Sequence, residues 1–251
     1  MTESMRMWVE VSFNVVYLAV IWAMVVLMAA RFDHVAPANR PAARRIAWAF
    51  ALLALGDTGH VGFRVLAYAL GGLEVAPVIG GAPVSLVGLG ALATAVTVTG
   101  FYVLILDTWR VHFERRYGWF EWILIGAALV RLVVMALPQN AWESVVPPQP
   151  WSTIRNLPLM GLGLGTAFLI LRDARAVHDR AFTWIGAMIV ISYACYAPVI
   201  FFVQQNPLIG MLMIPKTLAY VAIAFIAYTA LWRGDKARSA QNEFAQRAVR
   251  L

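Results

Sequence analysis

Ionisable side chains inside long apolar runs are the residues of this chain that could do chemistry. The stretch LALGDTGHVGFRV holds Asp57, His60 and Arg64. At 100° per residue these three share one stripe of a helix, with glycines on the adjacent face. A charge at membrane depth costs several kcal/mol unless it is paired or faces water. We therefore expect an acid, an imidazole and a guanidinium to line one wall of a polar site.

Other apolar runs add cations, an amide and hydroxyl groups to the same site. The candidate ligand-binding residues are Asp57, His60, Arg64, Arg131, Arg155, Asn156, Tyr193, Tyr196, Lys216, Thr217 and Tyr220. Counting from the ends of the runs places the four cations in the outer half of the membrane. Since only Asp57, Glu74 and Glu143 are expected nearby as acids, a positive excess remains that suits a carboxylate, a phosphate or a lipid headgroup.

Two structural roles for these charges are the alternative to ligand binding. Asp57 would pair with Arg64 or Lys216, which would neutralise it within the bundle. Arg131 and Arg155 would extend to the outer headgroups, as long basic side chains near helix ends often do.

The residues required for metal or covalent catalysis are scarce. Asp57 and His60 provide only two metal ligands, whereas zinc sites need three or four. The chain has one cysteine, Cys195, and contains none of the common catalytic motifs. We expect no metal and name no catalytic residue, and we interpret His60 as a proton carrier. A lipid-modifying enzyme with Asp57 or His60 as general base stays an alternative.

Seven apolar runs must position these residues. Of the 251 residues 61% are hydrophobic and 13% charged, whereas soluble domains are about half apolar and a quarter charged. The expected spans are roughly 11–30, 46–70, 84–108, 119–137, 157–172, 182–203 and 207–232. This pattern predicts an all-α, polytopic membrane protein with one seven-helix bundle over residues 1–232.

Basic residues between the spans predict the orientation. The segments 31–45, 109–118, 172–181 and 233–251 hold most of the 20 Lys and Arg residues, and the opposite side holds only Arg6 and Arg155. The positive-inside rule then places the N-terminus outside and the C-terminus in the cytoplasm, with 233–251 as a basic cytoplasmic tail. The charge favours anionic lipids on the cytoplasmic side rather than nucleic acid.

Small residues and prolines predict how the helices pack. Glycines occur at contact spacing in two spans, at Gly56, Gly59 and Gly62 and at Gly161, Gly163 and Gly165. Such glycines let helices approach closely in lipid and permit a homo-oligomer. Pro198 and Pro215 are expected to kink their helices and widen a cavity between them.

The plan of seven spans with Lys216 in the last one resembles that of microbial rhodopsins. In that family such a lysine carries retinal as a Schiff base, which makes a retinal-type chromophore an alternative cofactor. The likeness is topological only. Leu212 stands where that family has an aspartate, and the third span has no carboxylate before Asp107.

The segments GDTGHVGFR, LPQNAW, WSTIRNLP and GMLMIPKT resemble parts of an uncharacterised family of bacterial seven-span membrane proteins. The resemblance implies the bacterial inner membrane and supplies no activity.

These expectations combine into one functional hypothesis. A net-positive pocket between spans 2, 4, 6 and 7 opens outward, and the loop 139–156 roofs it. Arg64, Arg131 and Lys216 hold a small anion or lipid, and protonation of Asp57 or His60 changes its affinity during transport. The alternative is a receptor or sensor that signals to a cytoplasmic partner protein.

Overall fold

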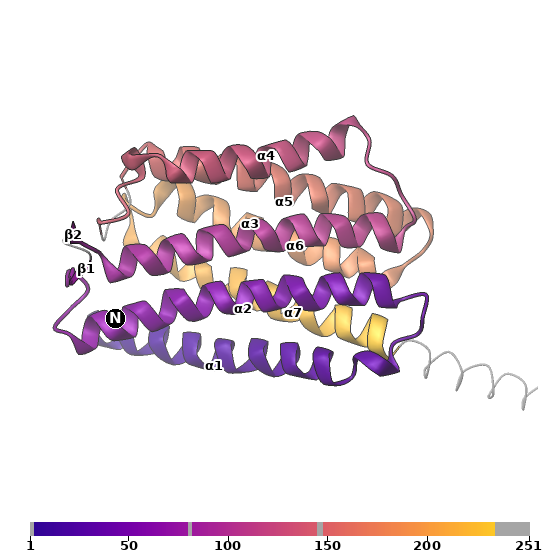
Figure 1. Cartoon of the computed structure of the whole chain (residues 1–251), viewed down its shortest axis with the longest axis horizontal. Coiled ribbons are helices and arrows are strands. Elements are labelled where there is room, and N and C mark those ends of the chain that lie inside the picture. The colour runs from indigo at the N-terminus through magenta and orange to yellow at the C-terminus, as the bar shows by residue number, and fades with distance from the viewer. Residues whose placement is uncertain (1–2, 80–81, 145–147, 234–251) are drawn as a thin grey trace, which may run out of the picture.

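Seven long helices form one bundle and run roughly parallel along the length of the molecule (Figure 1). The structure is a computed structural model that describes residues 3–79, 82–144 and 148–233. The helices are α1 (Glu3–Ala30), α2 (Arg40–Ala69), α3 (Leu86–His112), α4 (Trp119–Ala136), α5 (Trp151–Ala176), α6 (Arg180–Phe202) and α7 (Met213–Trp232). All are long and apolar enough to cross a membrane, α7 together with the turn that begins at Leu208. The predicted all-helical class with seven such helices is confirmed.

Short elements connect the helices and distinguish the two ends of the bundle. They are the 3₁₀ turns η1 (Phe32–His34), η2 (Pro138–Asn140) and η3 (Pro207–Leu212) and the strands β1 (Val78–Ile79) and β2 (Ala82–Pro83). The strands pair as an antiparallel hairpin beside the start of α1 (Figure 1). We call this the hairpin end, and we call the opposite end, where α7 finishes, the tail end.

Three helices begin at least six residues earlier than their apolar runs predict, the first of them being α1, which starts at Glu3 rather than near 11. The helix α2 starts at Arg40 rather than near 46, and α5 starts at Trp151 rather than near 157. Pro41 lies in the first turn of α2, where a missing N–H removes no helical hydrogen bond. The residues 151–156, expected in the roofing loop, are therefore the first turns of α5 and carry Arg155 and Asn156 on a rigid element.

Glycines allow close helix contacts at several of the predicted positions. A Cβ atom on Gly56 would lie 1.8 Å from a threonine hydroxyl of α3, and one on Gly163 would lie 2.1 Å from the Tyr193 ring. These two positions therefore need a glycine. Gly62 and Gly161 make no close contact inside the bundle, because a Cβ atom on either would meet nothing within 4 Å.

Prolines lie inside two helices. One of them, Pro198, was expected and the other was not. Pro198 lies inside α6 and Pro158 inside α5. The expected kink at Pro215 is wrong, because α7 begins at Met213 after the turn η3 and Pro215 sits in its first turn. Pro158 was overlooked because the predicted span began only one residue before it.

Candidate functional site

A cavity of about 500 Å³ lies in the half of the bundle nearer the hairpin end. All seven helices line it, together with the turn η3 and with Trp142 of the segment between α4 and α5, so the prediction that only spans 2, 4, 6 and 7 enclose the site is wrong. It reaches the surface beside α2, where Val65 is 48% and Tyr68 41% exposed. The predicted binding residues in its lining are Asp57, His60, Arg64, Arg131, Arg155, Asn156, Tyr196, Lys216, Thr217 and Tyr220.

One side of the cavity is a cationic wall, which we define as Arg131, Arg155, Asn156, Tyr196 and Lys216. The Asn156 side-chain oxygen accepts from Arg131 Nη2 at 3.4 Å and from the Tyr196 hydroxyl at 3.1 Å. The Lys216 ammonium lies 4.4 Å from the centre of the Tyr196 ring. These contacts join α4, α5, α6 and α7 in one continuous polar surface.

Trp142 lines the cavity and makes several contacts with neighbouring elements. Its indole N–H donates to the Met135 carbonyl at 2.9 Å, and the Arg155 guanidinium lies 4.2 Å from its ring centre. Arg155 also donates to the Asn140 side chain at 3.4 Å. The Trp142 backbone can approach α3 because Gly88 has no side chain there; a Cβ atom would lie 1.5 Å from the Trp142 carbonyl oxygen. Of the segment predicted to roof the cavity, Trp142 is a packed lining residue, and residues 145–147 lie outside the described residues.

The opposite side of the cavity is an acidic wall formed by α1, α2 and α3. The Asp57 carboxylate accepts hydrogen bonds from the Tyr17 hydroxyl at 2.7 Å and from the Thr94 hydroxyl at 3.2 Å. Within the described part of the chain, no Lys or Arg nitrogen lies within 4.0 Å of this carboxylate. The alternative in which Asp57 pairs with Arg64 or Lys216 is therefore wrong for this structure.

The two deeper arginines do not extend to headgroups either. Arg131 is 2% exposed and Arg155 is 7% exposed. Both guanidinium groups stay inside the bundle, although each sits only a few residues from the end of its helix. Hydrogen bonds to Asn140 and Asn156 take up only part of their donor capacity.

Three buried side-chain nitrogens lack any hydrogen-bond partner in the described residues, and all of them belong to this cavity. They are His60 Nδ1, Arg131 Nε and Arg131 Nη1. Buried polar groups in native proteins are almost always bonded, and an unbonded one costs about 1–3 kcal/mol, more when it is charged. Two of the side chains that line the cavity, His60 and Arg131, therefore have hydrogen-bonding capacity that the described residues leave unused.

The formal charges of the lining are strongly unbalanced. Arg64, Arg131, Arg155 and Lys216 face one carboxylate, that of Asp57. The difference is a formal charge of +3 when the imidazole is neutral. Since charges interact more strongly in a bundle interior than in water, this excess attracts an anion into the cavity.

Beneath the cavity a layer of tyrosines closes the bundle. The Tyr102 and Tyr220 hydroxyls lie 3.1 Å apart, and the Tyr193 hydroxyl donates to the Leu159 carbonyl at 2.9 Å. All three tyrosines are at most 4% exposed. Tyr193 therefore lies in this tyrosine layer rather than in the lining, and Tyr220 belongs to both.

Sequence reasoning missed Tyr17 as a residue of the site. It is the partner of Asp57 from α1, a helix in which no site residue was predicted. A tyrosine within an otherwise apolar run was the available signal. The sequence alone does not show that the Tyr17 side chain points toward α2, because that depends on how α1 and α2 pack.

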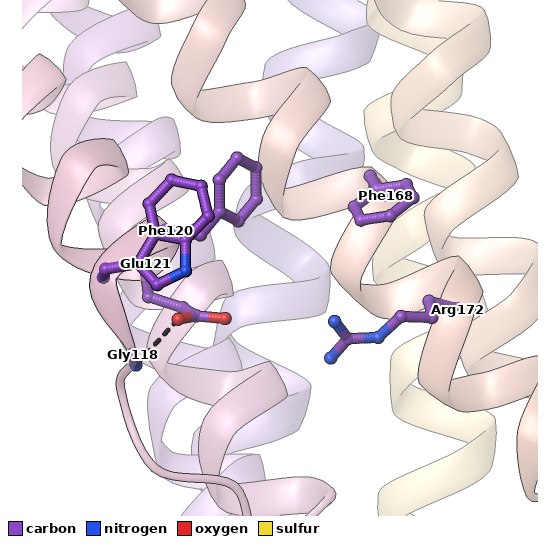
Figure 2. Close-up of a pocket in the computed structure, with 6 residues that line it drawn as sticks. Gly118, Phe120, Glu121, Phe168 and Arg172 are labelled. Atoms are coloured by element: carbon purple, nitrogen blue, oxygen red, sulfur yellow. Dashed lines mark hydrogen bonds between the residues drawn. The ribbon is translucent and has the colours of Figure 1, made fainter.

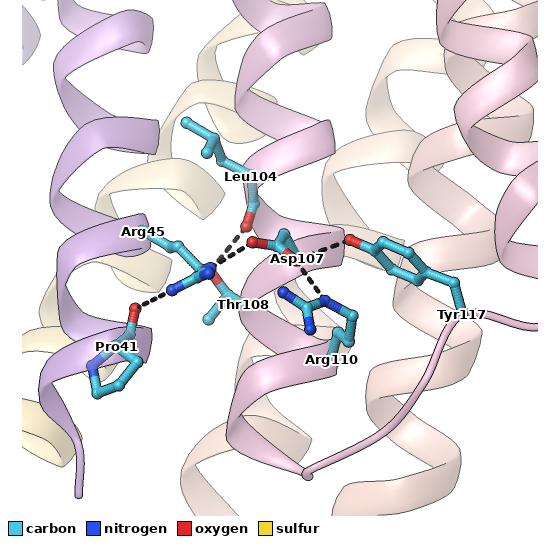
Figure 3. Close-up of polar contacts among 7 residues, drawn as sticks. All are labelled: Pro41, Arg45, Leu104, Asp107, Thr108, Arg110 and Tyr117. Atoms are coloured by element: carbon cyan, nitrogen blue, oxygen red, sulfur yellow. Dashed lines mark hydrogen bonds and ion pairs between the residues drawn. The ribbon is translucent and has the colours of Figure 1, made fainter.

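At the tail end, in contrast, the buried and half-buried aspartates have basic partners within the chain. Asp107 accepts hydrogen bonds from Arg45, from Arg110 at 2.6 Å and from the Tyr117 hydroxyl at 2.8 Å (Figure 3). Burial and the hydrogen bond to Asp107 raise the pKa of Tyr117 to about 12. Asp107 thereby ties α2 to α3 and to the segment that leads into α4.

A second acid at the tail end is bonded in the same way. Asp173 accepts from the Trp109 indole at 2.9 Å, from Arg172 at 2.9 Å and from Arg115 at 3.2 Å. Arg172 also borders a shallow depression of about 350 Å³, in which Glu121 accepts from the Gly118 backbone at 2.7 Å (Figure 2). This depression is lined by residues that already have partners.

Any inference about function must rest on the geometry and charge of the cavity. Within the described residues no group of three or more His, Cys, Asp or Glu side chains could hold a metal ion. Comparison with protein-family models, with curated proteins and with solved structures finds no match to this chain.

Proposed function

We propose that this protein binds a small anionic molecule or lipid in the cavity and moves it across the bacterial inner membrane. The observation that carries the proposal is Arg131, a buried arginine with two unpartnered nitrogens in a cavity of formal charge +3. A buried charge without a counter-ion is costly, and a bound carboxylate or phosphate would remove that cost. The planar fork of a guanidinium also fits both groups in a bidentate manner.

The proposed orientation follows from the charges at the tail end. The segments that lie there are the basic ones, so the positive-inside rule places the tail end in the cytoplasm. The hairpin end, the N-terminus and the mouth of the cavity then face outward. The resemblance of GDTGHVGFR and the three other segments to a bacterial family supports the choice of membrane.

A transport mechanism uses basic residues from both sides of the cavity, since Arg64 belongs to α2 and Arg131 and Lys216 belong to the cationic wall. Arg64, Arg131 and Lys216 hold the anion, and protonation of Asp57 or His60 changes the charge that the anion meets. For passage to the tail end, the tyrosine layer must open. The Tyr102–Tyr220 contact is the proposed gate, because it joins α3 to α7 directly under the cavity.

A receptor or sensor is the second candidate, and the closed tyrosine layer favours it. A ligand that binds above a sealed layer can shift α6 and α7 without passing through. Net transport by the pure protein in liposomes would support the first candidate. A specific cytoplasmic partner crosslinked in cells, without such transport, would support the second.

Native mass spectrometry of gently purified protein, followed by uptake measurements, tests the proposal. We expect an anionic species bound to the wild type and lost in Arg131→Gln and Lys216→Ala. The exposed tail-end variant Arg116→Gln is the matched control and should retain it. Proteoliposome uptake of that species should fall at least tenfold in Lys216→Ala and Arg64→Ala. Unchanged binding and uptake in these variants would show that the cavity is not the site.

A further inference from the structure

The cavity offers a ligand two chemically different walls. The cationic wall has free donors at Arg131 Nε and Nη1. The acidic wall has the Asp57 carboxylate and, one helical turn along α2, the unpartnered His60 Nδ1. A ligand that satisfies only the cationic wall leaves the histidine nitrogen buried and unbonded. The full site therefore demands a molecule with two kinds of polar group.

The second group of the ligand is constrained by charge. An ammonium would enter a cavity that already carries a formal charge of +3, and it would meet Arg64 and Lys216 on the way to Asp57. A second anionic group would be repelled by the Asp57 carboxylate. A hydroxyl carries no charge, donates to a carboxylate and either accepts from or donates to an imidazole nitrogen.

We propose that the ligand is a hydroxylated anion, with its phosphate or carboxylate on the cationic wall and a free hydroxyl between Asp57 and His60. This proposal rests on the proposed function and names the substrate class of the same site. A cavity of about 500 Å³ is within the range of small-molecule sites and holds a three-carbon ester with room to spare. Free glycerol phosphate and the headgroup of phosphatidylglycerol share this chemistry.

Paired probes that differ only in their hydroxyls test the inference. Binding of glycerol 3-phosphate and propyl phosphate, and of glycerate and propionate, is measured by calorimetry on the full detergent-solubilised chain. The wild type should prefer the hydroxylated member of a pair about tenfold, because each buried hydrogen bond to a charged group is worth that much. Phosphatidylglycerol and phosphatidylpropanol in nanodiscs, compared by native mass spectrometry, form the lipid pair.

Variants assign the preference to the acidic wall. Asp57→Asn and, independently, His60→Leu should abolish the preference, so that both members of a pair bind equally. Because Asp57→Asn also removes the one carboxylate of the lining, both members should bind this variant more tightly than they bind the wild type. Asp33→Asn, at an exposed aspartate of the tail end, is the control and should keep it. Arg131→Gln should weaken both members of each pair equally. Two separate variants protect the result against misfolding of either one.

The outcomes separate this inference from the proposed function. Equal binding of both members of every pair would overturn the hydroxyl inference and leave anion binding intact. No binding of any anion probe, lipid or soluble, would overturn both. A preference confined to the lipid pair would identify a headgroup as the source of the ligand, and one confined to the soluble pairs would identify a free metabolite.

Discussion

The two ends of this bundle use the same side chains in opposite ways. At the tail end Asp107 and Asp173 each accept from three side chains, most of them arginines. In the cavity near the hairpin end, Asp57 accepts from hydroxyls, and the buried Arg131 has no acidic partner among the residues that the structure describes. Ionic residues with partners within the chain stabilise its fold, whereas ionic residues buried without partners reduce its stability. The second arrangement persists in proteins where a ligand completes it.

The charged side chains at the two ends should therefore contribute differently to the free energy of unfolding. Removing one member of a buried, bonded ion pair leaves its partners unsatisfied and costs several kcal/mol. Removing a buried charge that has no partner relieves a cost instead. Substitutions at the two ends should therefore change stability in opposite directions, and this provides a direct test of the comparison.

The largest effect is expected at Asp173. Asp173→Ala should lower the free energy of unfolding by about 1–3 kcal/mol, because the buried Trp109 indole N–H loses its acceptor, whereas Arg115 and Arg172 are about half exposed and can bond to water instead. Denaturant titration in mixed micelles measures the change. Asp33→Ala, at an exposed acid of the same end, should change stability by less than about 0.5 kcal/mol. Equal losses in both variants would contradict the structural role of Asp173.

Much of the fold and of the site follows from the sequence for simple reasons. Apolar runs of membrane-spanning length are sufficient to locate helices, and the cost of buried charge is sufficient to select Asp57, Arg131 and Lys216 as unusual. Helical periodicity put Asp57 and His60 on one stripe, and both line the cavity. Their function as ligand-binding residues stays a prediction.

Pairing across helices could not be predicted in the same way. Tyr17 reaches Asp57, and Asn156 joins Arg131 to Tyr196, only because of how the helices are rotated about their axes. Hydropathy sets which residues lie in the membrane but leaves this rotation undetermined. For the same reason Tyr193 shares a stripe with polar neighbours in sequence and yet belongs to the layer below the cavity.

A smaller effect of opposite sign is expected at Arg131. Arg131→Met keeps the apolar stem and removes an unpaired buried charge, so the ligand-free protein should gain about 1–2 kcal/mol of stability. Asn156 keeps its hydrogen bond from Tyr196 in this variant. The same titration measures the gain, and the exposed Arg116→Met should show none. A loss at Arg131 would mean that this arginine already has a stabilising role within the chain, and the contrast between the ends would fail.

The smallest effect is a pH dependence of the free energy of unfolding, and it concerns an aspartate at the tail end. Asp179, between α5 and α6, accepts from His112 at 2.9 Å and from the Phe182 backbone N–H at 3.0 Å. Burial alone would raise the pKa of Asp179, but these hydrogen bonds outweigh it and hold that pKa below its usual value. Because the pKa is lower in the folded state, the stabilisation is complete above the unfolded pKa of about 4 and is lost as pH falls through the folded value. Wild type should exceed Asp179→Asn by about 0.5–1 kcal/mol at pH 6, and the difference should vanish near pH 2. A difference that is constant over this range would show that the carboxylate charge contributes nothing there.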